Sequence, residues 1–386
     1  MPNSAASRLV LEPFSEEAVI NAARGCLQEI GQNPSVVFAF VTSDYRPHLA
    51  DFLELLQLHA HATLIIGGSA TSLVGTGKEA EGTSGFSIQL LSLPETKLCA
   101  RAFTEDESDN FTALEWKNAF PTGRDSDVWI VLGNPMKIAT EPWLRTWSEA
   151  FPKVPMLGGL LSGGQRGDDV FVFHNRKEVD AGVLIGLRGG VKLHAVVSQG
   201  CRPIGEPHAI TGAQENVVSS IGSLPAYERL NESFESLTSE DKAHAAGNIF
   251  AGLAVNEYVD DFKTGDFLIR NLLGADPDSG AVELAAYPRV GQTLQFQLRD
   301  KHSADEELDH LLAQKARERV RPFAALVFVC GGRGVGLFGN PDHDALALQR
   351  HFGQITTTGL FCNGEIGPVC GANFVHGYTA VIGLLA

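Results

Sequence analysis

The sequence has few cysteines, no long hydrophobic run and no excess of basic side chains. Its six cysteines are spread over 386 residues, and no two have Cys-x-x-Cys spacing, which excludes a disulfide scaffold and leaves no recognisable zinc motif. No apolar stretch approaches the roughly 18 residues needed to span a bilayer, and the first residues lack the pattern of a secretory signal. We therefore expect a cytoplasmic protein with reduced thiols, no membrane insertion, no metal site and no cofactor.

The charge balance excludes another class of partner. The chain has 46 acidic and 30 basic side chains and a formal net charge of −16, which would repel a phosphate backbone. Nucleic acid is therefore not an expected partner. Because 44% of the residues are hydrophobic, the chain can bury a large core, and its length suits two domains or a composite of repeated units.

An order of predicted elements recurs along the chain. Over residues 35–104 an apolar strand, a helix and a strand ending in Gly67-Gly68 are followed by two alternating segments that suit antiparallel strands. The same β-α-β-β-β order returns over residues 127–198, with Gly158-Gly159 in the matching place. A third, partial copy is predicted between residues 325 and 384.

These copies predict an α/β protein with two domains, in which mixed β-sheets built from repeated β-α-β-β units are flanked by helices. Residues 201–320 differ in character from the copies, and we place the domain boundary near Ser223, before the predicted helix around Pro225. The expected parts are an N-terminal helix and extension over 1–34, a domain over 35–223 that holds two copies, and a domain over 224–386.

Each copy places a glycine-rich turn at the carboxyl end of an inner strand, where a ligand can approach the backbone closely. In the first copy Gly67, Gly68 and Ser69 are followed by a segment rich in Gly, Ser and Thr over residues 72–85, which we expect to be a flexible loop suited to hydrogen bonding with a small polar ligand. The motif is similar to a nucleophile elbow, but Thr71 stands where an elbow needs glycine. A catalytic Ser69 is therefore not expected.

Two other glycine motifs do not support nucleotide binding. Gly77-Lys78 lacks the earlier glycine and the following Ser or Thr of a phosphate-binding loop. Gly334, Gly336 and Gly339 match the spacing of a dinucleotide fingerprint, but Asn340-Pro341 interrupts the helix that should follow, so a turn is the favoured interpretation.

The segment from Cys362 to Cys370 is the most distinctive, because it follows an apolar strand and contains one charge between glycines. We predict that Asn363, Gly364 and Glu365 bind a ligand, with the carboxylate offered to a ligand amine; a tight turn with a solvated acid is the alternative. Cys362 could act as a nucleophile only beside a base, and a buried, inert thiol is favoured.

Arg202 is the remaining candidate. Its guanidinium offers five donors in a rigid fork beside Pro203, so this segment is predicted either to hold the domains together or to reach a ligand carboxylate. A capped surface turn is the alternative.

Three stretches give the chain a resemblance to the FIST proteins, which pair an N-terminal with a C-terminal FIST domain. They are Ile65-Ile-Gly-Gly-Ser-Ala-Thr71, Gln199-Gly-Cys-Arg-Pro-Ile-Gly205 with the following segment to Leu224-Pro225-Ala226, and Gly364-Glu-Ile-Gly-Pro368. The resemblance covers the chain from about residue 35 to 386. It implies a sensory protein that binds a small ligand such as an amino acid.

The sequence thus predicts a stand-alone sensor that binds a small polar ligand and signals through a partner protein. Two alternatives stay open. One is a thiol- or carboxylate-dependent hydrolase that uses Cys201, Cys362 or Glu365, although catalysis is not the favoured interpretation. The other is a protein-interaction scaffold without a ligand.

Overall fold

The computed structural model describes residues 2–164, 169–259, 262 and 265–386, and the chain divides into two compact units. Unit 1 comprises Met1–Val197 and Asp309–Ala386, and unit 2 comprises Ser198–Leu308. Ser223 lies inside unit 2, so the compact units and the predicted sequence domains divide the chain at different places. No helix among the described residues is long and apolar enough to cross a membrane.

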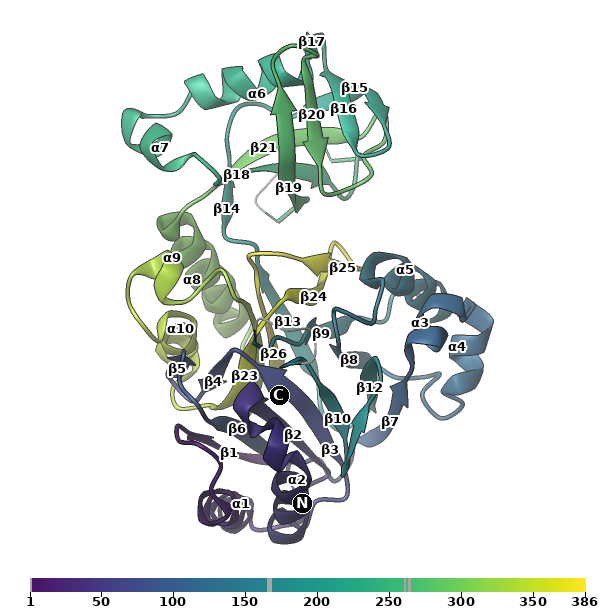
Figure 1. Ribbon diagram of the computed structural model, residues 1–386, viewed down its shortest axis with the longest axis vertical. Helices are drawn as coiled ribbons and strands as arrows, with labels where there is room; N and C mark the ends of the chain where they lie inside the picture. Colours follow the sequence, from purple (N-terminus) through teal and green to yellow (C-terminus); the bar gives the residue numbers. More distant parts are fainter. Residues whose placement is uncertain (1, 165–168, 260–261, 263–264) are drawn as a thin grey trace. The chain divides into compact units, whose positions relative to one another are not determined.

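Unit 1 contains three sheets that follow the same plan (Figure 1). At the centre of each sheet lie two parallel strands that a helix connects. These are β2 (Val36–Thr42) and β3 (Ile65–Ala70) with α2 (Leu49–Ala60), β8 (Val128–Gly133) and β9 (Met156–Leu160) with α5 (Thr140–Ala150), and β22 (Ala324–Cys330) and β23 (Thr356–Cys362) with α10 (His343–Phe352). The predicted α/β class with mixed sheets built from repeated units is confirmed.

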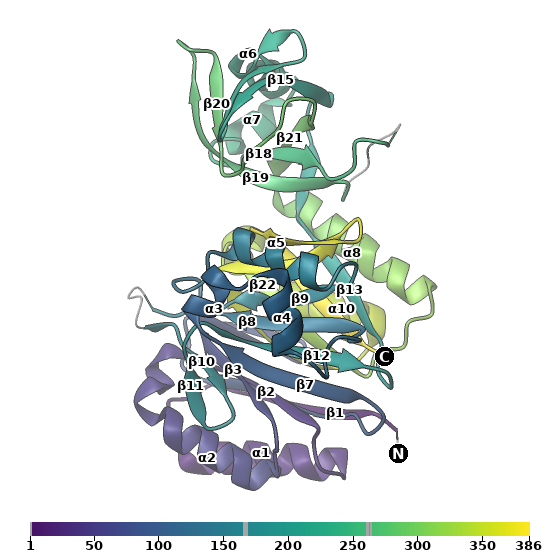
Figure 2. The same cartoon turned by 90° about the vertical axis from the view of Figure 1, so that its right-hand side faces the viewer.

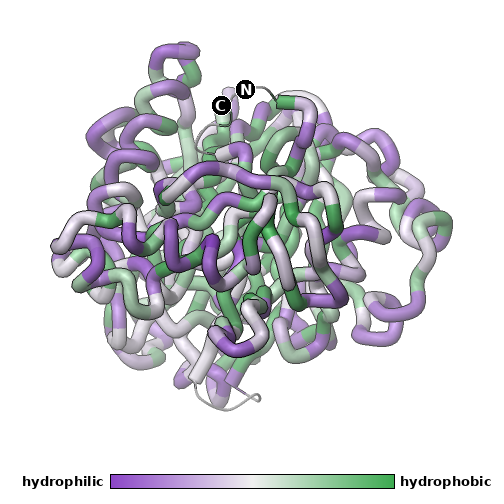
Figure 3. Tube along the Cα trace, turned by 90° about the horizontal axis from the view of Figure 1, so that it is seen from above, coloured by the Kyte–Doolittle hydropathy of each residue, from purple (hydrophilic) through white to green (hydrophobic). Residues whose placement is uncertain are grey.

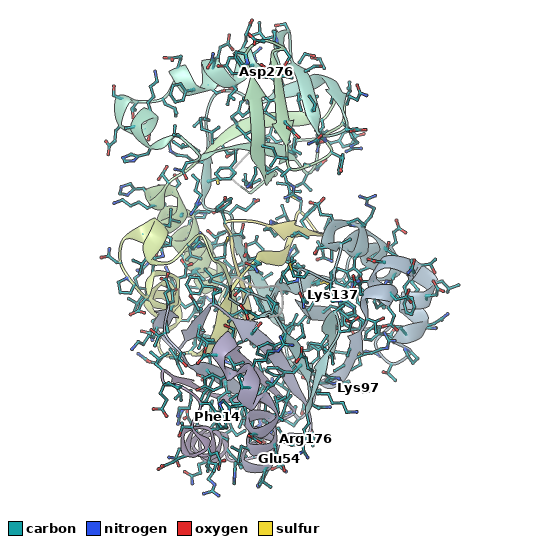
Figure 4. The ribbon with its side chains drawn as sticks, in the orientation of Figure 1. Phe14, Glu54, Lys97, Lys137, Arg176 and Asp276 are labelled. Atoms are coloured by element: carbon teal, nitrogen blue, oxygen red, sulfur yellow. The ribbon has the colours of Figure 1, made fainter. Side chains whose placement is uncertain are left out.

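A hairpin follows the second parallel strand of every repeat and joins the sheet of a different repeat. The hairpins are β4 (Ser72–Gly75) with β5 (Lys78–Glu81), β10 (Val172–His174) with β11 (Lys177–Val179), and β24 (Gly364–Val369) with β25 (Ala372–His376). Strand β4 pairs with β23, β10 pairs with β3 and β24 pairs with β9. In Figure 4 Arg176, from the turn of the second hairpin, lies beside Glu54 of α2 in the first repeat, and their charged groups are 2.6 Å apart.

The predicted flexible loop over residues 72–85 is therefore wrong in its first part. Leu73, Val74 and Ala80 are buried in the first hairpin, and β4 is hydrogen-bonded to β23. The composition of the segment hid this because small hydroxyl residues and glycine also suit a strand that packs tightly between neighbours.

Two further strands complete each repeat. Strands β6 (Phe86–Ser92), β12 (Gly182–Arg188) and β26 (Ala380–Leu385) pair antiparallel with β2, β8 and β22. The last strand of a repeat then joins the next sheet, as β7 (Lys97–Phe103) does beside β12 and β13 (Leu193–Ser198) does beside β26. Strand β1 (Ser4–Val10) takes the corresponding place beside β6. The third repeat is thus complete rather than partial, because β1 supplies its last strand from the start of the chain.

One glycine per repeat allows the parallel strands to approach. A Cβ atom on Gly67, Gly158 or Gly359 would lie 1.7, 1.9 or 2.0 Å from the carbonyl oxygen of Ala39, Val131 or Val327. All three glycines occupy the same register position in their parallel pairs. A residue with a side chain would force the strands apart at this point.

The three sheets of unit 1 enclose a common apolar core, to which each repeat contributes alternate strand residues such as Phe38, Ile130 and Phe328. Helices pack against the outer faces: α1 (Glu16–Ile30) and α2 cover the first sheet, and α3 (Glu105–Asn110), α4 (Ala113–Ala119) and α5 cover the second (Figure 2). Ser15 caps α1 and Gly31 ends it in the left-handed conformation, as the sequence predicts. The inner strands β2, β8 and β22 are almost entirely buried and apolar, and Figure 3 shows the hydropathy of every residue along the trace.

Aromatic side chains gather on the outer face of the second sheet. Trp116, Trp129, Trp143 and Trp147 are all buried there, with neighbouring ring centroids 5.0 to 6.4 Å apart. Edge-to-face geometry dominates these contacts, as the aromatic quadrupole favours. None of the four indole N–H groups has a hydrogen-bond partner among the described residues.

Unit 2 consists of a closed antiparallel sheet with short helices. Its strands are β14 (Cys201–Pro203), β15 (His208–Gln214), β16 (Val217–Ile221), β17 (Leu224–Pro225), β18 (Ile249–Ala254), β19 (Phe267–Asp276), β20 (Ala281–Leu284) and β21 (Thr293–Arg299), and its helices are α6 (Ala226–Glu235) and α7 (Ser239–His244). Strand β21 pairs with β15 on one side and with β18 on the other, which closes the sheet. Inward side chains such as Ile210, Val282 and Phe296 fill its interior.

Candidate functional site

Glu365 lies in strand β24, with its side chain turned toward the common core of unit 1. It pairs with Gly159 of β9 on one side and with His376 of β25 on the other. Its residue exposure is 0%. The neighbouring Ile366 packs on the opposite face, among the aromatic residues beneath α5, which is consistent with the alternation along a strand.

The other two repeats have apolar residues at the position of Glu365. Measured from the shared glycine of each parallel pair, Leu73 of β4 and Val172 of β10 occupy the register position that Glu365 occupies in β24. Both Leu73 and Val172 belong to the common core. The fold therefore accepts an aliphatic side chain at this position, and the carboxyl group of Glu365 is an exception to the plan of the repeats.

Only one carboxyl oxygen of Glu365 is satisfied. The backbone N–H of Thr379 donates to Oε2 at 3.2 Å, whereas Oε1 has no hydrogen-bond partner among the described residues. Burial raises the pKa of Glu365 well above its usual value, and the Thr379 N–H and the charge of Arg333 oppose this only in part. Burial therefore favours the protonated, uncharged form of this carboxyl group.

Two thiols lie next to this carboxyl group. Cys330 and Cys362 are register partners at the ends of β22 and β23, and the backbone N–H of Cys330 donates to the carbonyl oxygen of Thr379. Burial raises the pKa of Cys362 well above that of a free thiol, and Glu365 and Cys330 raise it further. Because the thiolate is the reactive form, this environment does not activate Cys362 as a nucleophile.

Arg333, whose charge acts on Glu365, belongs to a buried ion pair. The Nε and Nη2 atoms of Arg333 donate to the two carboxylate oxygens of Asp344 at 2.8 and 2.9 Å, and both side chains are at most 1% exposed. Burial alone would raise the pKa of Asp344, but Arg333 and a contact with His343 Nδ1 hold the pKa below its usual value. The pair thus contributes one positive and one negative charge to the interior.

A third buried carboxyl group adjoins this ion pair. Glu79, on strand β5 of the first hairpin, accepts a hydrogen bond from the backbone N–H of Ala345 in the first turn of α10 at 3.0 Å. Burial raises the pKa of Glu79 to about 8, with a further contribution from the charge of Asp344. We call Glu365, Thr379, Cys330, Cys362 and Arg333 the Glu365 site; Glu79 lies outside it.

The structure places the predicted residues of the first turn in the packed core. Gly67, Gly68 and Ser69 belong to β3 and are fully buried. A Cβ atom on Gly68 would lie 2.1 Å from Leu161 Cδ1, and Ser69 Oγ accepts from the backbone N–H of Phe171. These contacts are with the second repeat, and a ligand role for the three residues stays a prediction.

The ends of the three inner strands meet through hydrogen bonds. Ser162, after β9, accepts from the backbone N–H of Thr71 after β3 and donates to the carbonyl oxygen of Phe361 in β23. Asn363 Nδ2 donates to the carbonyl oxygen of Leu161 at 3.2 Å. The predicted convergence of the glycine-rich turns is thus present as a packed junction. Asn363 and Gly364 border the Glu365 site, and their role in binding stays a prediction.

Arg202 belongs to unit 2, where it pairs with two carboxylates. Its Nη2 atom lies 2.7 Å from Asp241 Oδ1, and its Nε atom donates to Asp300 Oδ2 at 3.1 Å. These contacts tie β14 to α7 and to the residue before α8 (Lys301–Arg317). Neither of the two predicted roles of Arg202 is tested by these contacts.

Sequence reasoning missed Arg333, Asp344 and Glu79. The signal for Arg333 was present, since Gly331-Gly-Arg-Gly334 follows an apolar strand as the glycine-flanked Glu365 does. The partners could not be found in this way, because Asp344 comes from α10 and Glu79 from another repeat.

The fold and the site together define a class: a threefold-repeated α/β unit whose core contains the half-satisfied carboxyl group of Glu365, with the closed antiparallel sheet inserted in the chain between the second and third repeats. Family models for the FIST N domain and the FIST C domain match residues 35–223 and 225–368. The chain belongs to the FIST family. FIST domains are sensory domains, so membership indicates a role in ligand binding or signalling.

The relatives of the chain match it over nearly their whole length. The uncharacterized protein Mb0898c of Mycobacterium bovis is 32% identical over 378 residues, which is 96% of either chain. The uncharacterized protein MT0656 of Mycobacterium tuberculosis is 33% identical over 375 residues, which is 96% of this chain and 97% of the relative.

Proposed function

We propose that the chain is a cytoplasmic sensory protein that binds a small polar ligand at the Glu365 site and signals through a partner protein. The observation that carries this proposal is a buried carboxyl oxygen without a partner, Oε1 of Glu365, at a core position where the sister repeats have leucine and valine. An unsatisfied buried polar group costs roughly 1–3 kcal/mol. Because an aliphatic side chain would avoid this cost, the carboxyl group is kept for a purpose other than folding.

In the ionised form of Glu365, the surroundings of Oε1 favour a ligand that donates hydrogen bonds. Oε2 already receives the N–H of Thr379, so Oε1 is left for the ligand. The Nε and Nη2 atoms of Arg333 are engaged by Asp344, and the nearby thiols are weak hydrogen-bonding groups. An amine such as that of an amino acid has the donors that this oxygen lacks.

The test compares the parent protein with Glu365→Leu. Native mass spectrometry of protein purified from its host shows whether a small molecule is retained, and titration calorimetry with that molecule measures its affinity. The parent protein should retain the ligand and Glu365→Leu should lose it, since leucine cannot accept a hydrogen bond.

The matched control is Leu73→Val, a change of one methylene at the equivalent position of the first repeat. This variant should bind like the parent protein. If Glu365→Leu retains the ligand with unchanged affinity, the Glu365 site is not the binding site and the proposal is wrong.

A further inference from the structure

The charges around Glu365 cancel when its carboxyl group is protonated. Arg333 carries one positive charge and Asp344 one negative charge, in a buried bidentate pair. Glu365 and Glu79 are the other two buried carboxyl groups of this region, and burial raises the pKa of both, which favours their uncharged forms. With both carboxyl groups protonated, these four side chains have no net charge.

A charge on any element packed against Glu365 would change this balance. Strand β22 brings Cys330 and β23 brings Cys362, whose raised pKa keeps the thiol neutral. Strand β25 brings the buried His376, with Nε2 3.0 Å from the carbonyl oxygen of Gly367. Strand β9 brings Gly159, which has no side chain. None of these strands contains a lysine, arginine, aspartate or glutamate residue, and neither does β26. The fixed charge that acts on Glu365 is that of Arg333, which is paired with Asp344.

A cationic ligand would upset this balance. An ammonium group beside a neutral carboxyl group would be a buried charge without a counterion, which is strongly unfavourable. Beside a carboxylate the same group forms a charge-assisted hydrogen bond. The oxygen available for it is Oε1, which lies within the protein and has no partner among the described residues.

We propose that a ligand with a primary ammonium group binds the Glu365 site in exchange for one proton, which Glu365 releases to solvent. This inference rests on the proposed function. In the exchange the O–H bond of the Glu365 carboxyl group breaks, the proton passes to the buffer, and the carboxylate pairs with the intact ammonium group. The net charge of the interior is the same before and after binding.

The exchange has a measurable signature. Where Glu365 is protonated in the free protein and the amine is protonated in solution, one proton leaves for each ligand bound, so affinity rises about tenfold per pH unit. Calorimetric titrations with glycine, L-lysine and methylamine as probes, each in phosphate and in MOPS, neither of which contains a primary amine, at pH 6, 7 and 8, measure proton release from the difference in heat between buffers. The parent protein should release about one proton per bound probe.

Two variants identify the carboxyl group that releases the proton on ligand binding. Glu365→Gln should abolish both the release and the pH dependence of any residual binding, and Glu365→Leu repeats the test if the glutamine variant does not fold. Glu79→Gln removes the neighbouring buried carboxyl group and should still release about one proton. Loss of release in Glu79→Gln but not in Glu365→Gln would overturn the assignment to Glu365.

A measurement on the protein without ligand tests this inference separately from the proposed function. The infrared difference between the parent protein and Glu365→Gln at pH 7 should show the carbonyl stretch of a protonated carboxylic acid, and its absence would overturn proton exchange whatever binds. A probe that binds with equal heat in both buffers and with pH-independent affinity would also overturn the exchange while leaving the proposed function intact. If no probe binds and no molecule is retained in native mass spectrometry, both are wrong.

Discussion

Three equivalent positions in the core of unit 1 hold Leu73, Val172 and Glu365. The repeats are an internal comparison, because the same backbone environment is occupied by an aliphatic side chain twice and by a carboxyl group once. Burial of the carboxyl group costs free energy that the aliphatic side chains do not. Exchanging glutamate and leucine between these positions therefore distinguishes an effect on stability from an effect on ligand binding.

Glu365→Leu should leave the melting temperature unchanged or raised. The variant removes an unsatisfied buried carboxyl oxygen, a gain of about 1–3 kcal/mol, and leaves the buried Thr379 N–H without its acceptor, which costs a similar amount. Leucine adds buried apolar area, which is stabilising. Leu73→Glu should lower the free energy of unfolding by roughly 3 kcal/mol or more, since it buries an unpaired carboxyl group in place of leucine. Thermal and denaturant unfolding measure both changes, and a strong loss of stability in Glu365→Leu would mean that the carboxyl group has a structural role.

A second prediction at the level of single residues concerns the glycines of the parallel strand pairs. Gly359→Ala should cost about 2 kcal/mol or more, because its Cβ atom would lie 2.0 Å from the carbonyl oxygen of Val327 and the strands would have to move apart. Gly336→Ala, where no atom lies within 4 Å of the added Cβ among the described residues, is the control and should change stability by less than about 0.5 kcal/mol. Equal stabilities in denaturant titrations would contradict the close approach of β22 and β23.

Only the local sequence pattern of the candidate site could be recognised before the structure was known. A single charge between glycines after an apolar strand singled out Glu365. Its burial and its unpaired oxygen could not be foreseen, because they depend on β9 and β25 pairing on either side and on Thr379 arriving from beyond the hairpin. The first glycine motif had an equally good pattern, yet Gly67 and Gly68 are explained by close contacts between strands.

Among the elements, the first hairpin shows how a segment gains its structure from distant partners. Strand β4 pairs with β23, while Glu79 and Glu81 of β5 accept hydrogen bonds from the backbone N–H groups of Ala345 and Val335 at the beginnings of α10 and α9 (Val335–Phe338). The partners are more than 250 residues away in sequence. Local composition indicated a loop, since pairing over such a separation has no local signal.

The stability of the protein should depend on the ionisation of Glu79. Its pKa is about 8 in the folded protein, above the value of 4.5 for an unperturbed glutamate, so between these values the folded state holds a proton that the unfolded state has lost. The contribution is complete below about pH 4.5 and is lost as the pH rises toward 8, with a slope of at most about 1.4 kcal/mol per pH unit.

Glu79→Gln should reduce this dependence in denaturant titrations between pH 5 and 8. Glu81→Gln, at the exposed end of the same strand, is the matched control and should keep the slope of the parent protein. Identical slopes in the parent protein and Glu79→Gln would show that the buried carboxyl group does not carry the proton.

For the whole molecule, the sequence predicted the repeated order of elements. It did not predict the strand pairings that join the three repeats to one another. Apolar strands and paired glycines revealed the copies, because every repeat must bury the same faces. The exchange of hairpins between repeats and the completion of the third repeat by β1 follow from pairings that join the two ends of the chain. No local sequence pattern indicates the exchange of hairpins or the completion of the third repeat by β1.

Unit 2 should fold without the rest of the chain. Its closed sheet leaves few open edges, and its apolar residues form a cluster of their own. A fragment of residues 198–308 should therefore unfold cooperatively in circular dichroism, with dispersed amide signals in nuclear magnetic resonance. A fragment of residues 35–104 is the control and should stay unfolded, because its hairpin and its last strand lack the sheets with which they pair. A folded repeat fragment or an unfolded unit 2 fragment would contradict this division.

The aromatic cluster beneath α5 confines the tryptophan fluorescence of the protein to unit 1. All four tryptophans of the chain lie in it, between residues 116 and 147, and residues 198–308 contain tyrosine but no tryptophan. Light absorbed only by tryptophan therefore reports the integrity of unit 1 alone, from a dry environment that favours short-wavelength emission. Loosening of unit 2 would pass unseen in such a measurement, so a difference between the fluorescence and circular dichroism transitions of the intact chain would measure how independently the two units unfold.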